Sequence, residues 1–164
     1  MGNNIDIVEF NKNHTEAVKD LLVELQEYIA SIDKFKLNIL TDEYRDRYFE
    51  LTMEEVYSNQ GKIFVATNND CVVGMVAGYK VSYTVDDQID YKCPPKGMIS
   101  ELIVSKNQRG GGVGKQLMSQ MEKYLTDIGC EYIKLQVFAY NQTAYDFYKN
   151  LGYEPVLIDM LKKV

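Results

Sequence analysis

The sequence predicts a mixed α/β fold, in which helices cover both faces of one central sheet. Strand-type and helix-type hydrophobic patterns follow one another in the order strand, two helices, three strands, helix, strand, helix, strand. The 164 residues suffice for one sizeable core and leave little room for two full domains. Because no repeat, low-complexity tract or linker interrupts the chain, we expect residues 1–164 to form a single domain.

The amino-terminal half is predicted to hold a strand, two helices and a hairpin. Apolar residues alternate loosely over 4–10, as in a strand, and recur at three- and four-residue steps from residue 13, as in a helix. The pair Thr41-Asp42 offers N-caps for a second helix. The turn Asn68-Asn69-Asp70 then separates two strand-like runs, as in a hairpin. The expected bounds are a strand over 4–10, a helix from 13, a helix from 41 to about 57, and strands over 62–67 and 71–83.

The carboxyl-terminal half is predicted to alternate strands and helices after a surface loop. Residues 84–96 are polar and carry Pro94-Pro95, so we expect a loop, followed by a strand over 97–105. Strands are also expected over 131–138 and 153–161, with a short helix ending at Gly152 between them. The longer helix before them has an apolar stripe ending at a C-cap glycine, Gly129. Its members are Val113, Leu117, Met121, Leu125 and Ile128.

Composition and charge exclude several classes of function. The chain carries 18 basic and 24 acidic side chains, a net charge of −6, which disfavours nucleic acid and attracts a cationic substrate weakly. No apolar run is long enough for a membrane span, and the first residues lack the build of a signal peptide, so we expect a cytoplasmic protein and no membrane partner. Three scattered cysteines and a single histidine, His14, favour neither disulfides nor a metal site.

The strongest motif is the glycine-rich turn from Gln108 to Lys115, between a predicted strand and a predicted helix. Glycines let the backbone approach a ligand, and a helix N-terminus adds partial positive charge, so the turn suits a phosphate or pyrophosphate. Arg109 and Lys115 can add charge-assisted hydrogen bonds. Gln116 follows Lys115 where a Walker loop needs Ser or Thr, and the glycine spacing does not fit the dinucleotide-binding fingerprint.

The turn and a second block downstream resemble the GNAT acetyltransferase superfamily. Its hallmark, Q/R-x-x-G-x-G/A on a strand–turn–helix, is matched by Arg109, Gly112 and Gly114. The run from Asn141 to Tyr153 is similar to its second signature, N-x-x-A-x-x-F/L-Y-x-x-x-G-F/Y. The resemblance covers about residues 98–155. It implies a GNAT-like acyl-CoA N-acyltransferase fold with a mostly antiparallel sheet, and an acetyltransferase that uses acetyl-CoA as co-substrate.

The resemblance also implies a role for individual residues. The backbone of Leu102, Ile103 and Val104 would pair with the pantetheine arm. Asn141 would hydrogen-bond the cofactor where the sheet splays open, and Tyr148 would lie near the thioester sulfur. The pyrophosphate would be held by the backbone amides of Arg109, Gly110, Gly111, Gly112, Val113, Gly114 and Lys115.

Acetyl transfer to an amine also needs a base and an acid. A neutral amine must attack the thioester carbonyl, a backbone N–H can stabilise the oxyanion, and the Tyr148 hydroxyl can protonate the leaving thiolate. We expect Glu101 to accept the amine's proton, since it lies in the strand that leads to the turn. Strand alternation places Glu101 on the side of Ile99 and Ile103 unless a bulge changes this. The alternatives are a structural glutamate and a tyrosine that only packs in the core.

The acceptor site is less well defined by the sequence. Tyr28, Tyr79 and Tyr83 fall on segments that flank the acceptor in relatives, and they are candidates for a substrate wall or for core packing. Only about a dozen residues follow Gly152, so we expect a shortened carboxyl-terminal strand region and an edge that leaves room for a homodimer.

Several functions remain open at this point. The leading hypothesis is transfer of an acetyl group to a primary amine of a small molecule or protein, by direct attack in a ternary complex. The alternatives are a non-catalytic acyl-CoA binding or sensing module and a transferase for longer acyl chains. If Glu101 is not the base, Glu24 and Asp33 are weaker candidates.

Overall fold

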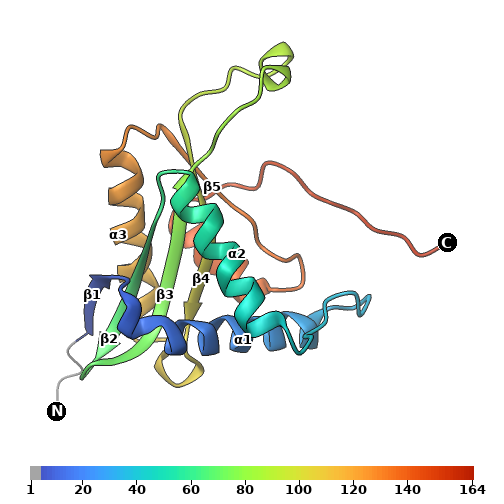
Figure 1. Ribbon diagram of the computed structural model, residues 1–164. Helices are drawn as coiled ribbons and strands as arrows, with labels where there is room; N and C mark the ends of the chain where they lie inside the picture. The colour runs from blue at the N-terminus through green and yellow to red at the C-terminus, as the bar shows by residue number, and fades with distance from the viewer. Residues whose placement is uncertain (1–4) are drawn as a thin grey trace.

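A computed structural model describes residues 5–164 as one five-stranded sheet with helices on both faces (Figure 1). The spatial order of the strands follows the sequence, β1-β2-β3-β4-β5. Strands β1 to β4 pair antiparallel with one another, and β5 is parallel to β4, so the predicted mixed, mostly antiparallel sheet is confirmed. The strands are β1 (Ile5–Glu9), β2 (Lys62–Asn68), β3 (Cys71–Lys80), β4 (Lys96–Val104) and β5 (Tyr132–Leu135).

The helices form two layers on the sheet. Helices α1 and α2 cover one face and α3 covers the other, and the apolar side chains of α4 join the α3 layer. None of the helices within residues 5–164 is long and apolar enough to cross a membrane. The helices are α1 (Thr15–Ile32), α2 (Tyr44–Ser58), α3 (Val113–Asp127) and α4 (Gln142–Asn150), with short 3-10 turns η1 (Lys12–His14), η2 (Asp86–Ile89) and η3 (Lys106–Gln108).

Each face of the sheet has its own hydrophobic core. The α3 core holds the predicted stripe of α3, in which Leu117, Met121 and Leu125 are fully buried. The α1 and α2 core includes Val18 and Leu22, which were expected from the helical period of the first helix. Each fully buried side chain of this size contributes about 1.5–3 kcal/mol through the hydrophobic effect, so the two cores hold both helical layers on the sheet.

An irregularity in β4 decides which way its side chains point. Ala77 is opposite Glu101 while the next residue of β3, Gly78, is opposite Ile99, so β4 has one extra residue, Ser100. An extra residue reverses the alternation of side chains. Ile99 therefore packs in the α3 core, whereas Ile103 packs in the α1 and α2 core and Glu101 faces α2. The expectation that Glu101 shares a side with Ile99 was wrong, and its side with Ile103 is confirmed.

Several predicted elements differ in their bounds. The strand expected over 131–138 is only the four-residue β5, because the chain leaves β4 after Leu135. The second helix begins at Tyr44, and neither Thr41 nor Asp42 caps it by a side chain; the backbone amide of Tyr44 donates to the carbonyl of Thr41. The strand expected over 4–10 is confirmed from Ile5 to Glu9, and residue 4 lies outside the described residues.

The final strand predicted over residues 153–161 is wrong. This segment runs away from the sheet as an extended tail (Figure 1). A strand is stable only when a neighbouring chain pairs with its amides and carbonyls, and no described strand lies beside this segment. Its apolar side chains are accordingly exposed, among them Val156 at 96% and Met160 at 94%.

Candidate active site

The glycine-rich turn between β4 and α3 has the backbone shape that suits an anion. Gly110 and Gly112 both have φ +82°, a conformation that side-chain-bearing residues adopt rarely. A Cβ added at either glycine would meet no atom within 4 Å, so the space beside the turn is open. Within residues 5–164, no acceptor takes a hydrogen bond from the backbone amides of residues 110–115. The turn and the first turn of α3 therefore present free donors to the open side.

The Arg109 side chain fastens this turn to its neighbours. Its Nε donates to the Val104 carbonyl at 2.8 Å, and its Nη2 is 3.0 Å from Glu24 Oε1 on α1. The guanidinium lies 5.8 Å from the centre of the Tyr28 ring. By contrast, Lys115 has no carboxylate of the described chain within ion-pair distance, so its ammonium is available to a ligand.

Strands β4 and β5 part at the middle of β4. Their pairing runs from Lys96 opposite Tyr132 to Ile99 opposite Leu135 and ends there. On this side the rest of β4, which includes Leu102, Ile103 and Val104, has no neighbouring strand among residues 5–164, so an extended ligand can pair with its backbone.

Asn141 lies across this gap, at the start of α4. Its Oδ1 accepts from the Ala144 amide at 3.2 Å and from the Tyr28 hydroxyl at 3.3 Å. The side chain therefore caps α4, as N-cap residues do. No described acceptor takes the two N–H groups of Nδ2, which can donate to a ligand in the gap.

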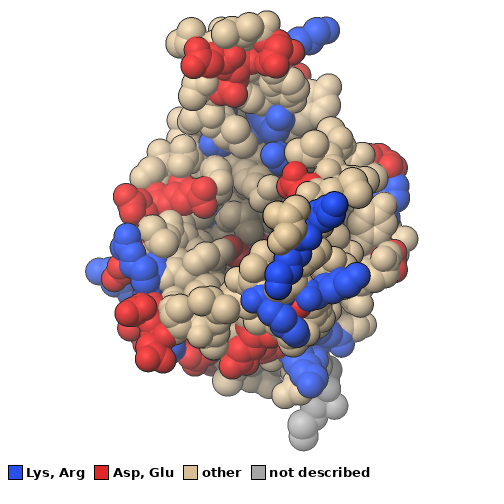
Figure 2. Space-filling model, turned by 90° about the vertical axis from the view of Figure 1, so that its right-hand side faces the viewer, with Lys and Arg blue, Asp and Glu red and all other residues tan. Residues whose placement is uncertain are grey.

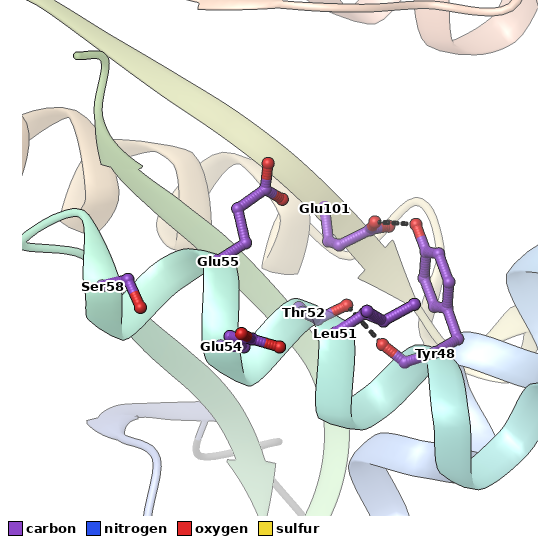
Figure 3. A pocket seen from close by; sticks show the side chains of 7 residues that line it. All are labelled: Tyr48, Leu51, Thr52, Glu54, Glu55, Ser58 and Glu101. Carbon is purple, nitrogen blue, oxygen red and sulfur yellow. Dashed lines mark hydrogen bonds between the residues drawn. The ribbon is translucent and has the colours of Figure 1, made fainter.

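Glu101 lies on β4 at the edge of a pocket of about 480 Å³ between β4 and α2 (Figure 3). Its side chain is 8% exposed, and the Tyr48 hydroxyl donates to Oε1 at 2.5 Å. Burial raises the pKa of Glu101 to about 7, Glu55 adds to the rise, and the Tyr48 hydrogen bond opposes it. A carboxyl with this pKa exchanges a proton near neutral pH, as a general base requires.

Tyr148 lies on α4, on the other face of the sheet, and is partly buried against the α3 core. Its ring packs edge-on against Phe147 and Tyr153, with centroids 5.4 and 6.0 Å away. Burial raises the pKa of Tyr148 to about 12, and the Glu101 carboxylate is the second cause. Because the charge on Glu101 acts on the Tyr148 hydroxyl, the structure brings the two predicted catalytic residues into electrostatic range of each other.

The three candidate substrate tyrosines do not form one wall. Tyr28 lies beside Asn141 and Arg109, at the cofactor turn. The Tyr79 hydroxyl donates to Glu55 at 2.6 Å, next to the pocket. Tyr83 donates to the Pro94 carbonyl within the loop before β4, so it is tied to that loop.

Sequence reasoning missed the residues of α2 that line the pocket. Tyr48 lines the pocket, and its ring stacks on that of Tyr44, outside the lining, with centroids 4.7 Å apart. Burial and then the Glu101 charge raise the pKa of both hydroxyls. Residues 44, 48, 52 and 55 recur at three- and four-residue steps, so the helical period could have placed them on one face. The sequence could not show that this face lies opposite Glu101.

The two alternative bases are already engaged. Glu24 pairs with Arg109 and also accepts from the Lys106 amide at 2.9 Å. Asp33 is buried, and it accepts hydrogen bonds from the backbone and side chain of Asn38 and from two further amides. The bonds from Asn38 come first among the causes that lower its pKa to about 2. Asp33 therefore stays ionised at neutral pH, and its hydrogen bonds fix the loop after α1.

The face of the molecule that lies at the right of Figure 1 is hollowed at its centre (Figure 2). Acidic side chains border the hollow on the left, and a red patch lies within it. Lys and Arg side chains gather on the right of the hollow. The surface therefore presents both charges around one depression, as a site for an anionic cofactor and a cationic acceptor requires.

Comparison with known proteins identifies the family. Residues 28–153 match the family model described as the acetyltransferase (GNAT) family. A thialysine N-epsilon-acetyltransferase of Bos taurus is 26% identical over 136 residues, which cover 80% of this chain and 74% of that protein. The chain therefore belongs to the acetyltransferase (GNAT) family, and it is an N-acetyltransferase of the class that uses acetyl-CoA.

Solved structures agree on the fold. A Bacillus halodurans protein superimposes with a TM-score of 0.83 at 18% identity, covering 97% of this chain and 99% of that one. An aminoglycoside N-acetyltransferase in complex with CoA gives a TM-score of 0.72 at 19% identity, covering 100% of this chain and 97% of that one. At these identities the likeness establishes the fold, and the substrate has to be argued from the site.

Proposed function

We propose that residues 1–164 act as one domain that transfers the acetyl group of acetyl-CoA to a cationic primary amine, by direct attack in a ternary complex. The observation that carries this proposal is the buried Glu101 carboxyl, which faces a pocket beside the gap between β4 and β5. The amine would enter from the pocket and the thioester from the gap. The strand between them, β4, would present both groups to each other.

The residues present fit the cofactor. The free amides of the glycine-rich turn and the Lys115 ammonium suit the pyrophosphate, and the unpaired edge of Leu102–Val104 suits the amide groups of pantetheine. Asn141 has two free N–H donors at the far side of the gap. When bound, acetyl-CoA would supply an activated acyl group and a thiolate leaving group. Arg109 would act mainly by holding the turn in shape.

Glu101 would take the proton of the acceptor amine. A primary ammonium has a pKa of about 10.4 in water, so it arrives charged and must lose a proton before it attacks. A carboxylate with a pKa of about 7 is ionised in a large fraction of molecules at neutral pH and is more basic than an ordinary glutamate. The Tyr48 hydroxyl holds Oε1, which leaves Oε2 for the amine.

Tyr148 would donate a hydrogen bond to the leaving sulfur. Its raised pKa keeps the hydroxyl protonated, so the donor is always present. The charge on Glu101 contributes to that rise. Once Glu101 has accepted the amine's proton this contribution disappears, and Tyr148 becomes more acidic as negative charge develops on the sulfur. Backbone N–H groups on the free edge of β4 would stabilise the oxyanion.

Self-association is a further part of the proposal. The tail after α4 exposes Leu157 and Ile158 at 79% and 77%, and the edge strand β5 has no outer neighbour among the described residues. A second copy could cover these side chains in a homodimer. Light scattering of the purified chain would give a dimer mass, and a monomer mass at all concentrations would contradict it.

Release of free CoA tests the proposed activity directly. Purified protein with acetyl-CoA should release CoA only when an amine is added, and the panel should include polyamines, aminoglycosides, amino acids and peptides with free N-termini. A non-catalytic acyl-CoA binding module would bind acetyl-CoA and release nothing with any acceptor. Comparing acetyl-CoA with longer acyl-CoA donors on the best amine would separate an acetyltransferase from a transferase for longer chains.

A further inference from the structure

Three carboxylates, including that of Glu101, line the pocket without a cation to balance them. Glu54, Glu55 and Glu101 are all lining residues, and none of them has a Lys, Arg or His partner within 4.0 Å in residues 5–164. Other acids on the same helix are paired: Asp46 with Lys19, and Glu50 with Arg47. No lysine or arginine lines the pocket. Negative charge is therefore concentrated in the one place where the acceptor would bind.

Two of these carboxyl groups are held in place by hydrogen bonds. Glu101 is more than nine-tenths buried, and only its Oε1 has a partner among the described residues, so Oε2 is free toward the pocket. Glu55 is held by the Tyr79 hydroxyl at 2.6 Å, and Figure 3 shows its carboxylate pointing from α2 toward β4, the strand that carries Glu101. The two carboxylates are close enough for Glu55 to act on the titration of Glu101. The pocket thus holds two carboxyl groups that are each fixed by a tyrosine hydroxyl.

The wall between these groups suits an alkyl chain. Tyr48 and Glu55 are seven residues apart on α2, which corresponds to about 10 Å along a helix axis. Leu51 and Thr52 lie between them along the helix and line the same pocket. An apolar stretch between two carboxylates matches a chain of methylenes with an amine at each end.

We propose that the acceptor is a short linear diamine, which places one amine at Glu101 and keeps its second amine, as an ammonium, at Glu55 with support from Glu54. This inference rests on the proposed function and adds the substrate class. An alkyl monoamine would leave Glu55 without a cation. A diamino acid would bring its own carboxylate into a pocket that already holds three and has no basic side chain to receive it.

Three matched acceptors test the inference with the full chain and acetyl-CoA. Putrescine, butylamine and ornithine each carry an amine on a chain of four carbons. Butylamine lacks the second ammonium, and only ornithine has a carboxylate. We expect kcat/KM for putrescine to exceed that for butylamine by roughly 10-fold to 100-fold, the range for a hydrogen bond to a charged group. Ornithine should be poorer than putrescine by at least tenfold. Equal values for putrescine and butylamine, or a preference for ornithine, would overturn the proposal.

Variants of α2 show whether Glu55 is the reason. Glu55→Gln keeps the shape and the Tyr79 contact but removes the charge, and it should reduce the putrescine-to-butylamine ratio toward one. Glu54→Gln should reduce the ratio less, because no hydrogen bond to another described side chain fixes Glu54. Glu50→Gln is the matched control on the same helix, since Glu50 pairs with Arg47 and does not line the pocket, and it should leave the ratio as in the wild type.

The outcomes separate this inference from the function on which it rests. Release of CoA with butylamine but no preference for putrescine would retain the acetyltransferase proposal and refute the diamine. An unchanged ratio in Glu55→Gln, in protein whose circular dichroism matches the wild type, would refute the role of Glu55. No release of CoA with any amine would refute both.

Discussion

Replacing Glu101 by glutamine should stabilise the protein and slow the reaction at the same time. The wild-type carboxyl is buried, and its pKa is raised from 4.5 to about 7. Between these values the folded state binds more protons than the unfolded state, so its stability falls as the pH rises through this window. At pH 8 the ionised, buried carboxylate costs roughly 3 kcal/mol, whereas at pH 5 the cost is below about 1 kcal/mol.

Thermal unfolding measures this difference. Glu101→Gln cannot ionise, and its amide oxygen can still accept from the Tyr48 hydroxyl. The midpoint temperature of the variant relative to the wild type should therefore rise by roughly 5–10 °C between pH 5 and pH 8 for a chain of this size. Glu50→Gln, an exposed substitution on α2, should show no such trend.

The activity of the same variant separates a base from a structural glutamate. Turnover on the best amine should fall by roughly 100-fold, within the range for general acid–base catalysis, while the affinity for acetyl-CoA stays near the wild-type value. The wild-type rate should rise with pH from about 6 toward 9, through ionisation of Glu101 and a growing fraction of free amine. Wild-type turnover in Glu101→Gln, or a stability difference that does not depend on pH, would refute the reasoning.

Three further substitutions test the rest of the site. Tyr48→Phe removes the hydrogen bond that lowers the pKa of Glu101, which is worth roughly 1.5 kcal/mol. The acidic limb of the pH–rate profile should therefore move up by about one pH unit. An unmoved limb would show that this hydrogen bond does not lower the pKa of Glu101. Tyr148→Phe keeps the ring packing and should lower turnover roughly 100-fold with little effect on acetyl-CoA affinity, and full activity would leave Tyr148 a packing residue. Gly112→Asp places a carboxylate in the open space beside the turn, so calorimetry should show that acetyl-CoA binding is lost. Circular dichroism should be unchanged, since Asp tolerates positive φ better than most residues. Unchanged affinity for acetyl-CoA would show that the pyrophosphate binds elsewhere.

The order of strands and helices was predictable because each element is encoded by its own residues. The stripe on α3 and the strand-like runs of β2 and β3 depend only on nearby side chains, and all are found in the structure. Bounds were less certain where pairing decides them. The segment after Gly152 holds an apolar run like that of a strand, yet it has no described neighbour to pair with, and it stays extended and exposed.

The cofactor turn is the part of the site that the sequence determined by itself. Glycines at positions 110 and 112 permit the positive φ that the turn adopts, and the helix that follows supplies free amides, so a local run of residues defines an anion site wherever the fold places it. The same holds for Asn141, whose role as the cap of α4 follows from its place before a helical run.

The acceptor side was decided only by the tertiary structure. Tyr48 and Glu101 are 53 residues apart, and Tyr79 and Glu55 are 24 apart, so these contacts exist only because α2 packs across β3 and β4. The extra residue at Ser100 turns Glu101 toward α2, and the burial that follows raises its pKa. Sequence patterns report the period of one element, whereas the environment of a carboxyl depends on which elements meet around it, and that is settled when the two helical layers close on the sheet.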